Sequence, residues 1–235
     1  MLRKVGKYLF GSLFALSLIF LISVHSFAQF TEYDNLKQAV TNIIEPNIES
    51  KLNYTDVLRI CGYQEKIEVY IENIGNVSVA CDRIKEAGQE KFLSLFTDAI
   101  FDKLYSKEYT CDFIGCLSEQ PLVMVSSYAN SFFKSLELPL IMSTIILAIF
   151  YLMLEETNIK RLKGFGYTLL VSGIQFFVLY YIKDFFLKQA EILAILNSLF
   201  SSMIFYYTLA LVFGAVLFTA GYILEKRAKG LISKK

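Results

Sequence analysis

The four cysteines are the side chains of this sequence best suited to covalent chemistry: Cys61, Cys81, Cys111 and Cys116. A redox-active pair usually has two intervening residues and an electropositive setting. Four residues separate Cys111 from Cys116, and one of them is Asp112. A four-thiolate zinc site usually shows two short Cys pairs, and only one short pair is present. An even number of cysteines in an exported segment instead predicts structural disulfides.

Three disulfide pairings are open to four cysteines. We favour Cys61–Cys81 with Cys111–Cys116, because the second pair is close in sequence and the first would clamp a predicted hairpin to the residues before it. Each link of this type stabilises a small domain by about 2–4 kcal/mol.

Other reactive groups are sparse. The only histidine, His25, lies in an N-terminal leader, so a chain without that leader has no histidine for a Ser-His-Asp or Cys-His system. No glycine-rich phosphate loop follows a predicted strand. Asp98 and Asp102 share one face of a predicted helix, where solvated carboxylates are expected. We therefore expect no catalytic residue, no metal site and no cofactor.

Two sequons match the pattern for asparagine-linked glycans: Asn53-Tyr54-Thr55 and Asn76-Val77-Ser78. Both fall in the segment predicted to be exported, which glycosylation requires. They are candidate glycan sites, although two matches among nine asparagines exceed chance only slightly.

The leader, residues 1–28, has the layout of a secretory signal peptide. Arg3, Lys4 and Lys7 precede an apolar run, and Ser26-Phe27-Ala28 forms a small-residue cleavage pattern. We expect cleavage before Gln29. The alternative is an uncleaved membrane anchor, and both interpretations export the residues that follow.

Three further segments contain no Asp, Glu, Lys or Arg: residues 138–154, 164–182 and 199–224. About 20 apolar helical residues cross a bilayer core, so these segments predict transmembrane helices and the lipid bilayer as a partner. The short loop 155–163 and the tail 225–235 are basic, which places both in the cytoplasm. The loop 183–198 has balanced charges and is expected outside.

Residues 29–137 form the predicted extracytoplasmic domain, with 10 basic and 17 acidic residues. This acidic balance argues against a nucleic-acid partner, since phosphate binding needs clustered cations. Alternation over residues 66–81 predicts a β-hairpin. Helices are expected before Pro46, from an N-cap at Asp82 over about 24 residues, and from Pro121 onward.

Small residues mark one face of the last span: Ala210, Gly214 and Gly221. Such faces let helices approach closely, either within this chain or in assembly with a second copy or another membrane protein.

The sequence thus predicts an α-helical multi-pass membrane protein, with three transmembrane helices after a signal peptide and a small disulfide-linked α+β extracytoplasmic domain. The expected role is non-catalytic: an accessory, structural or interaction component of a membrane assembly or cell envelope. Two alternatives are an extracytoplasmic binding or sensing module coupled to a partner membrane protein, and a thiol–disulfide oxidoreductase.

Overall fold

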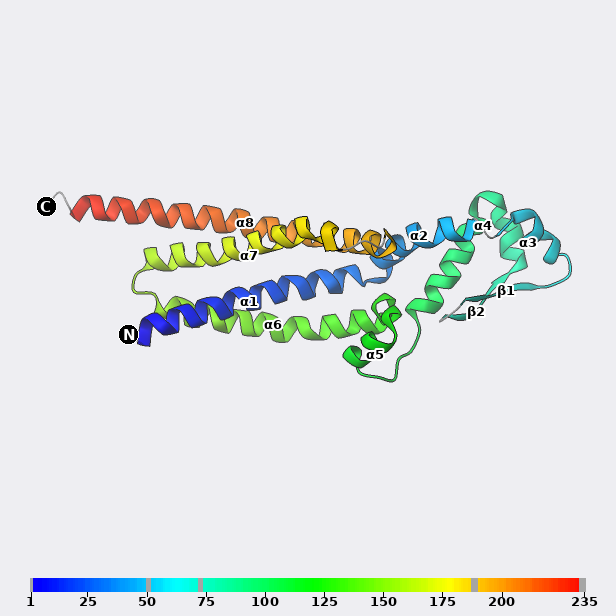
Figure 1. Cartoon of the computed structure of the whole chain (residues 1–235), viewed down its shortest axis with the longest axis horizontal. Coiled ribbons are helices and arrows are strands. Elements are labelled where there is room, and N and C mark those ends of the chain that lie inside the picture. The colour runs from blue at the N-terminus through cyan, green and yellow to red at the C-terminus, as the bar shows by residue number, and fades with distance from the viewer. Residues whose placement is uncertain (1, 50–51, 72–73, 187–189, 233–235) are drawn as a thin grey trace. The chain divides into compact units, whose positions relative to one another are not determined.

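The computed structural model describes residues 2–49, 52–71, 74–186 and 190–232. The chain divides into two compact units (Figure 1). The helical unit comprises Met1–Phe27 and Phe133–Lys235, and the mixed unit comprises Ala28–Phe132.

The helical unit is built from long apolar helices. They are α1 (Leu2–Phe30), α6 (Ser127–Leu154), α7 (Asn158–Phe186) and α8 (Ala190–Ile232), of which α1 and α6 each continue into the mixed unit. Three helical stretches in the described chain are long and apolar enough to cross a membrane: Val5–Phe30, Ser127–Leu154 and Leu199–Lys229. The first of them coincides with the leader. The expected span 164–182 lies inside α7, which is not among these three stretches of the described chain.

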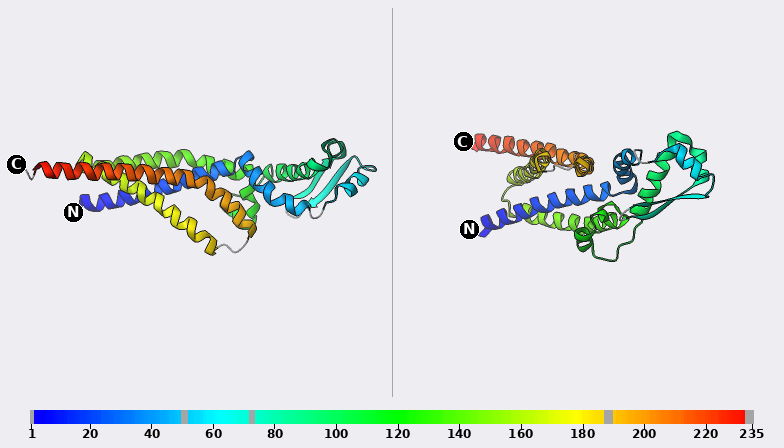
Figure 2. Two further views of the ribbon diagram at one scale, coloured as in Figure 1. Left: turned by 90° about the horizontal axis from the view of Figure 1, so that it is seen from above. Right: turned by 45° about the vertical axis from the view of Figure 1, so that its right-hand side comes forward.

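The mixed unit contains helices and a small sheet. Its elements are α2 (Tyr33–Glu49), α3 (Tyr54–Ile60), β1 (Lys66–Ile71), β2 (Gly75–Ala80), α4 (Cys81–Tyr105), α5 (Phe113–Glu119) and the 3-10 helix η1 (Pro121–Val125). Strands β1 and β2 pair antiparallel (Figure 2). Ile67 lies opposite Val79, and Val69 lies opposite Val77. The predicted hairpin is therefore confirmed.

The core of the mixed unit lies between the hairpin and helix α4. Ile67, Val77 and Val79 are buried on the hairpin side. Helix α4 contributes the apolar residues Phe92, Phe96, Ile100, Phe101 and Leu104. Leu95 and Ala99 of the same helix are partly buried against this core.

Helix α4 differs from its expected form at two points. It begins at Cys81 with Ala80 as the N-cap, so Asp82 lies in the first turn rather than at the cap. The backbone N–H of Cys81 donates to the carbonyl of Glu65, which draws the start of the helix toward β1. Gly88 then interrupts the helix with φ 69° and ψ −179°, a conformation that is essentially restricted to glycine.

Other helix ends also differ from expectation. Helix α2 continues past Pro46 to Glu49, although proline removes a backbone hydrogen bond and favours an end before it. Pro121 begins a separate 3-10 turn, and the extended backbone of Ser126 divides that turn from α6. The segment 183–198, expected as a loop, is helical in α7 to Phe186 and in α8 from Ala190. This segment has apolar residues at helical spacing and neither glycine nor proline.

Candidate functional site

Cys61 and Cys81 are disulfide-bonded within the core of the mixed unit. Their Cα atoms are 5.3 Å apart, and both side chains are buried. Val57 of α3, Val79 of β2 and Ile84 of α4 belong to the same apolar cluster. The bond therefore joins the end of α3 to the start of α4 across the hairpin. This is the pairing favoured from the sequence.

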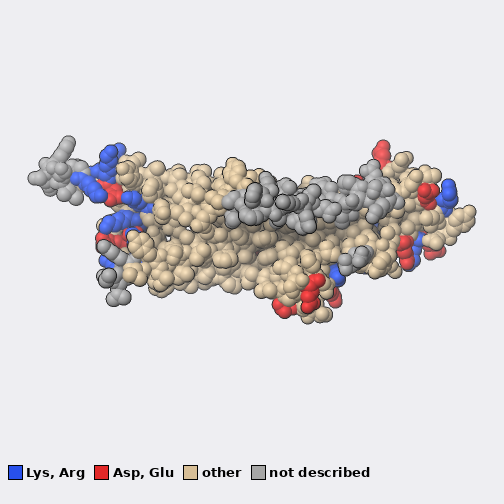
Figure 3. Space-filling view, viewed as in Figure 1, with Lys and Arg blue, Asp and Glu red and all other residues tan. Residues whose placement is uncertain are grey.

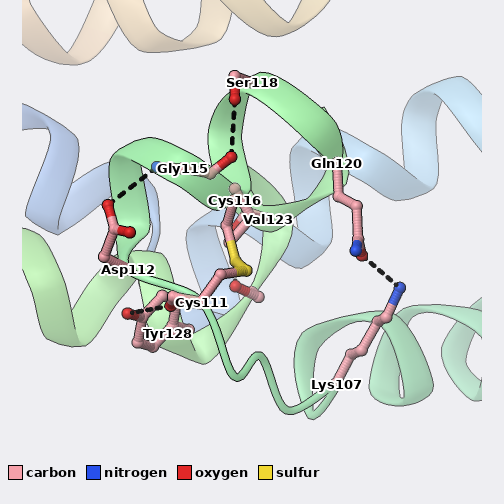
Figure 4. The surroundings of a disulfide bond; sticks show 10 residues. Lys107, Cys111, Asp112, Gly115, Cys116, Ser118, Gln120, Val123 and Tyr128 are labelled. Carbon is pink, nitrogen blue, oxygen red and sulfur yellow. Dashed lines mark hydrogen bonds between the residues drawn. A yellow bond between two sulfur atoms is a disulfide. The ribbon is translucent and has the colours of Figure 1, made fainter.

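Cys111 and Cys116 form the second disulfide-bonded pair, with Cα atoms 5.5 Å apart (Figure 4). Asp112 lies between them as the N-cap of α5, where its Oδ2 accepts a hydrogen bond of 3.0 Å from the N–H of Gly115. The hydroxyl of Tyr128 donates to the carbonyl of Cys111 at 2.9 Å. Cys116 is fully buried.

The surroundings of Cys116 lack two features that are typical of a reactive cysteine. A reactive cysteine needs access to its substrate and a positive setting that stabilises the thiolate. Cys116 has no exposed surface, and the carboxylate of Asp112 is the neighbouring charge in sequence. The hydrogen bonds at Asp112 and Tyr128 hold the loop in place, as the disulfide does.

The two candidate glycan sites lie on the surface of the mixed unit. Asn53 is the exposed N-cap of α3, and its Oδ1 accepts from the N–H of Thr55 at 3.0 Å. Asn76 is exposed on β2 opposite Tyr70. A glycan is attached through the side-chain nitrogen, so the capping oxygen of Asn53 would keep its role.

The paired carboxylates of α4 are engaged with α2. Lys37 Nζ lies 2.9 Å from Asp98 Oδ1, and the Tyr33 hydroxyl donates to Asp102. Hydrogen bonding to Asp98 raises the pKa of Lys37. Hydrogen bonding to Asp102, together with burial, raises the pKa of Tyr33. These four side chains therefore connect two helices.

The small residues of α8 lie where α7 and α8 approach closely. A Cβ added to Gly214 would lie 2.6 Å from the backbone nitrogen of Leu170, and one added to Gly221 would lie 2.8 Å from that of Lys163. Ala210 is buried. Helix α7 contributes Gly166 and Gly173 to the same contact. The seven-residue spacing of Gly166 and Gly173 was the sequence signal for a small-residue face on α7.

Helix α1 makes specific polar contacts with the other helices of the helical unit. Ser17 Oγ lies 2.7 Å from Thr144 Oγ1 on α6. Ser23 Oγ lies 2.9 Å from the Tyr207 hydroxyl on α8. Phe14 is buried and stacks on Phe165 of α7. The leader therefore contacts α6, α7 and α8.

His25 joins three helices near one end of this unit. Its Nδ1 lies 2.9 Å from Glu137 Oε1 on α6, and its Nε2 lies 3.2 Å from the Tyr206 hydroxyl on α8. Sequence reasoning set His25 aside as a leader residue and missed this cluster. A histidine at the end of an otherwise apolar run was the available signal.

Charged residues gather at the opposite end of the helical unit (Figure 3). Lys7 Nζ lies 2.6 Å from Glu155 Oε1, and Glu155 is only 3% exposed. Lys163 lies 2.9 Å from Glu225, which also pairs with Lys229. The Nε of Arg3 donates to the carbonyl of Leu154 at 3.0 Å. These contacts tie α1 to α6 and α7 to α8.

Within the described residues, no group of three or more His, Cys, Asp or Glu side chains is arranged to hold a metal ion. No protein-family model, curated protein or solved structure matches this chain. The function must therefore be inferred from the residues and their contacts.

Proposed function

We propose that this chain is a non-catalytic multi-pass membrane protein that presents the mixed unit outside the membrane as an accessory or interaction component of a membrane assembly. The observation that carries the proposal is the burial of the Cys61–Cys81 bond in the apolar core of the mixed unit. The strongest candidate nucleophiles of the chain are thereby assigned to holding its fold.

The other chemically capable side chains have similar structural contacts. Asp98 and Asp102 bind side chains of α2, and Glu137 binds His25. These contacts support a scaffold rather than a reaction centre.

The helical unit is the proposed membrane anchor, with its basic end in the cytoplasm. The start of α7 carries Lys160, Arg161 and Lys163, and the end of α8 carries Lys226, Arg227 and Lys229. Basic residues that flank membrane spans stay inside. This orientation puts the mixed unit and its cysteines in an oxidising compartment.

We further favour retention of α1 over the expected cleavage before Gln29. The Ala28–Gln29 peptide lies within helix α1, and the carbonyl of Ala28 accepts a hydrogen bond of 2.7 Å from Asn130 Nδ2. Ser26 and Ala28, the small residues of the cleavage pattern, are both buried. Removing α1 would also leave Glu155 without Lys7.

Exposed tyrosines of the mixed unit are the proposed contacts for a partner. Tyr63 is 90% exposed and Tyr70 on β1 is 73% exposed. Tyrosine is enriched at protein interfaces because it has a large apolar ring and a polar tip.

The test is affinity purification from membranes in mild detergent, followed by identification of co-purifying proteins. We expect a partner membrane protein in stoichiometric amount, and its recovery should fall at least tenfold for the variant Tyr63→Ser/Tyr70→Ser. The exposed α4 variant Glu86→Ser is the control and should retain the partner. Reduction of disulfide substrates by the purified chain alone would contradict the proposal.

A further inference from the structure

A cavity of about 860 Å³ lies inside the helical unit, with walls from α1, α6, α7 and α8. Ligand sites typically fall between about 300 and 1,000 Å³. The residues of α1 in its wall run from Lys7 to Ile19, a distance of about 18 Å at 1.5 Å per helical residue. The cavity is therefore long enough to take an extended chain.

Small side chains create this space. Gly11 and Ala15 line it from α1, and Gly164 lines it from α7. A Cβ on Gly164 would lie 2.4 Å from the Tyr151 hydroxyl, and one on Gly11 would lie 3.1 Å from the same ring. The Tyr151 side chain therefore lies directly against both glycines.

The cavity is charged at one end only. Lys7, Lys160 and Lys163 line it together with Glu155 and Glu225. Lys7 pairs with Glu155 and Lys163 pairs with Glu225, so Lys160 is the lining cation whose partner, Glu156, does not line the cavity. Lys160 is free to exchange its partner, because its pair with Glu156 is exposed on both sides, and exposed pairs contribute little to stability. Toward the other end the wall is mostly apolar, with Leu16, Ile19 and Val171, and Gln175 is a polar side chain in this part.

The cavity also borders the outer surface of the helices. Tyr8, Leu16 and Tyr167 line it and are all exposed. In a membrane, such side chains face lipid, so a molecule could enter sideways from the bilayer.

We propose that this cavity binds one anionic phospholipid from the cytoplasmic leaflet, with the phosphate near Lys160 and an acyl chain along α1. Basic pockets between helices on the cytoplasmic side are suited to anionic head groups. A soluble anion would contact the charged end of the cavity but would bury no apolar surface against the rest of its wall. This inference rests on the proposed membrane orientation and on retention of α1.

The experiment uses the full-length protein, purified in detergent and given equimolar phosphatidylglycerol and phosphatidylcholine before native mass spectrometry. We expect one phosphatidylglycerol per chain, retained at least tenfold better than phosphatidylcholine. Lys160→Gln should reduce that preference about fivefold, in line with about 1 kcal/mol per basic residue. The control Lys226→Gln removes an exposed charge that does not line the cavity and should change nothing.

A second variant tests the apolar part. Ala15→Phe fills the cavity, so it should lose both lipids while its thermal unfolding temperature stays within a few degrees of the wild type. Equal retention of the two lipids by wild type, or retention by a folded Ala15→Phe chain, would overturn the proposal.

The mass of the unliganded chain shows whether an absence of lipid binding results from loss of α1 or from the lack of a lipid site in the intact chain. A mass of 26.9 kDa shows that α1 is present. A chain shortened by the leader would overturn the retention of α1 and, with it, this site.

Discussion

Lys7 of α1 and Glu155, directly after α6, form an ion pair of 2.6 Å in which the carboxylate is almost fully buried while Lys7 is 39% exposed. A carboxylate in that position needs a positive partner, because removing one member of a buried pair leaves an uncompensated charge. The leader is therefore joined to the helical unit by electrostatics as well as by packing.

Lys7→Met should destabilise the full-length chain by about 3 kcal/mol, at the low end of the range for buried pairs because Lys7 is partly solvated. The double variant Lys7→Met/Glu155→Gln should recover most of this loss. Chemical unfolding in detergent, followed by circular dichroism, measures both. Lys160→Met is the matched control, since its exposed pair with Glu156 contributes less than about 1 kcal/mol. A Lys7→Met chain as stable as wild type would argue against this contact.

Removing the disulfides should weaken the mixed unit unequally. Cys61→Ala/Cys81→Ala opens a loop with a sequence separation of 20, which costs about 3 kcal/mol by chain entropy. Cys111→Ala/Cys116→Ala opens a separation of 5 and costs about 2 kcal/mol. Denaturant unfolding of the full chain measures the difference. Mass spectrometry of alkylated, unreduced peptides should show both bonds, and alkylated Cys111 and Cys116 would revive the oxidoreductase hypothesis.

Several features were predictable from sequence because they depend on local pattern. The alternation around Ile67 and Val79 specified the hairpin, and the uncharged runs located apolar helices. The cysteine pairing followed from sequence distance and the hairpin.

Other features depend on tertiary contacts and left no local pattern. Helix α4 is interrupted at Gly88 because this residue has a positive φ angle. A glycine within a helical sequence pattern does not by itself predict such an angle. The partners of Ser17, Ser23 and His25 come from other helices. The sequence showed polar residues in an apolar run, but a leader expected to be removed offered no reason to seek their partners.

The close contact of α7 with α8 should reject even one methyl group. A Cβ on Gly166 would lie 2.4 Å from the backbone nitrogen of Phe218, so Gly166→Ala should cost about 1–3 kcal/mol through overpacking. Gly6→Ala is the control, because its Cβ would meet only Leu154 Cδ1 at 3.6 Å. Thermal unfolding in detergent compares the two. Equal stability of both variants would show that the close approach of these helices is not an energetic constraint.

The mixed unit should lose stability in alkali. The pKa of Lys37 is raised above 10.5 and that of Tyr33 above 10.0, so the folded state binds more protons than the unfolded state. Their contribution is complete below about pH 10 and is lost as the pH rises through the raised values. Tyr33→Phe/Lys37→Met should remove this alkaline step from a pH series of unfolding midpoints. An unchanged step in the variant would assign it to other groups.

The most direct test of the central claim is the side of the membrane on which the mixed unit lies. Glu86→Cys in the mixed unit and Lys226→Cys near the end of α8 each introduce an exposed thiol. Each variant is treated with a membrane-impermeant maleimide in sealed, right-side-out vesicles. Outward display of the mixed unit predicts that Glu86→Cys is labelled at once and that Lys226→Cys is labelled only after permeabilisation. Labelling of Lys226→Cys in sealed vesicles, with Glu86→Cys protected, would contradict the account.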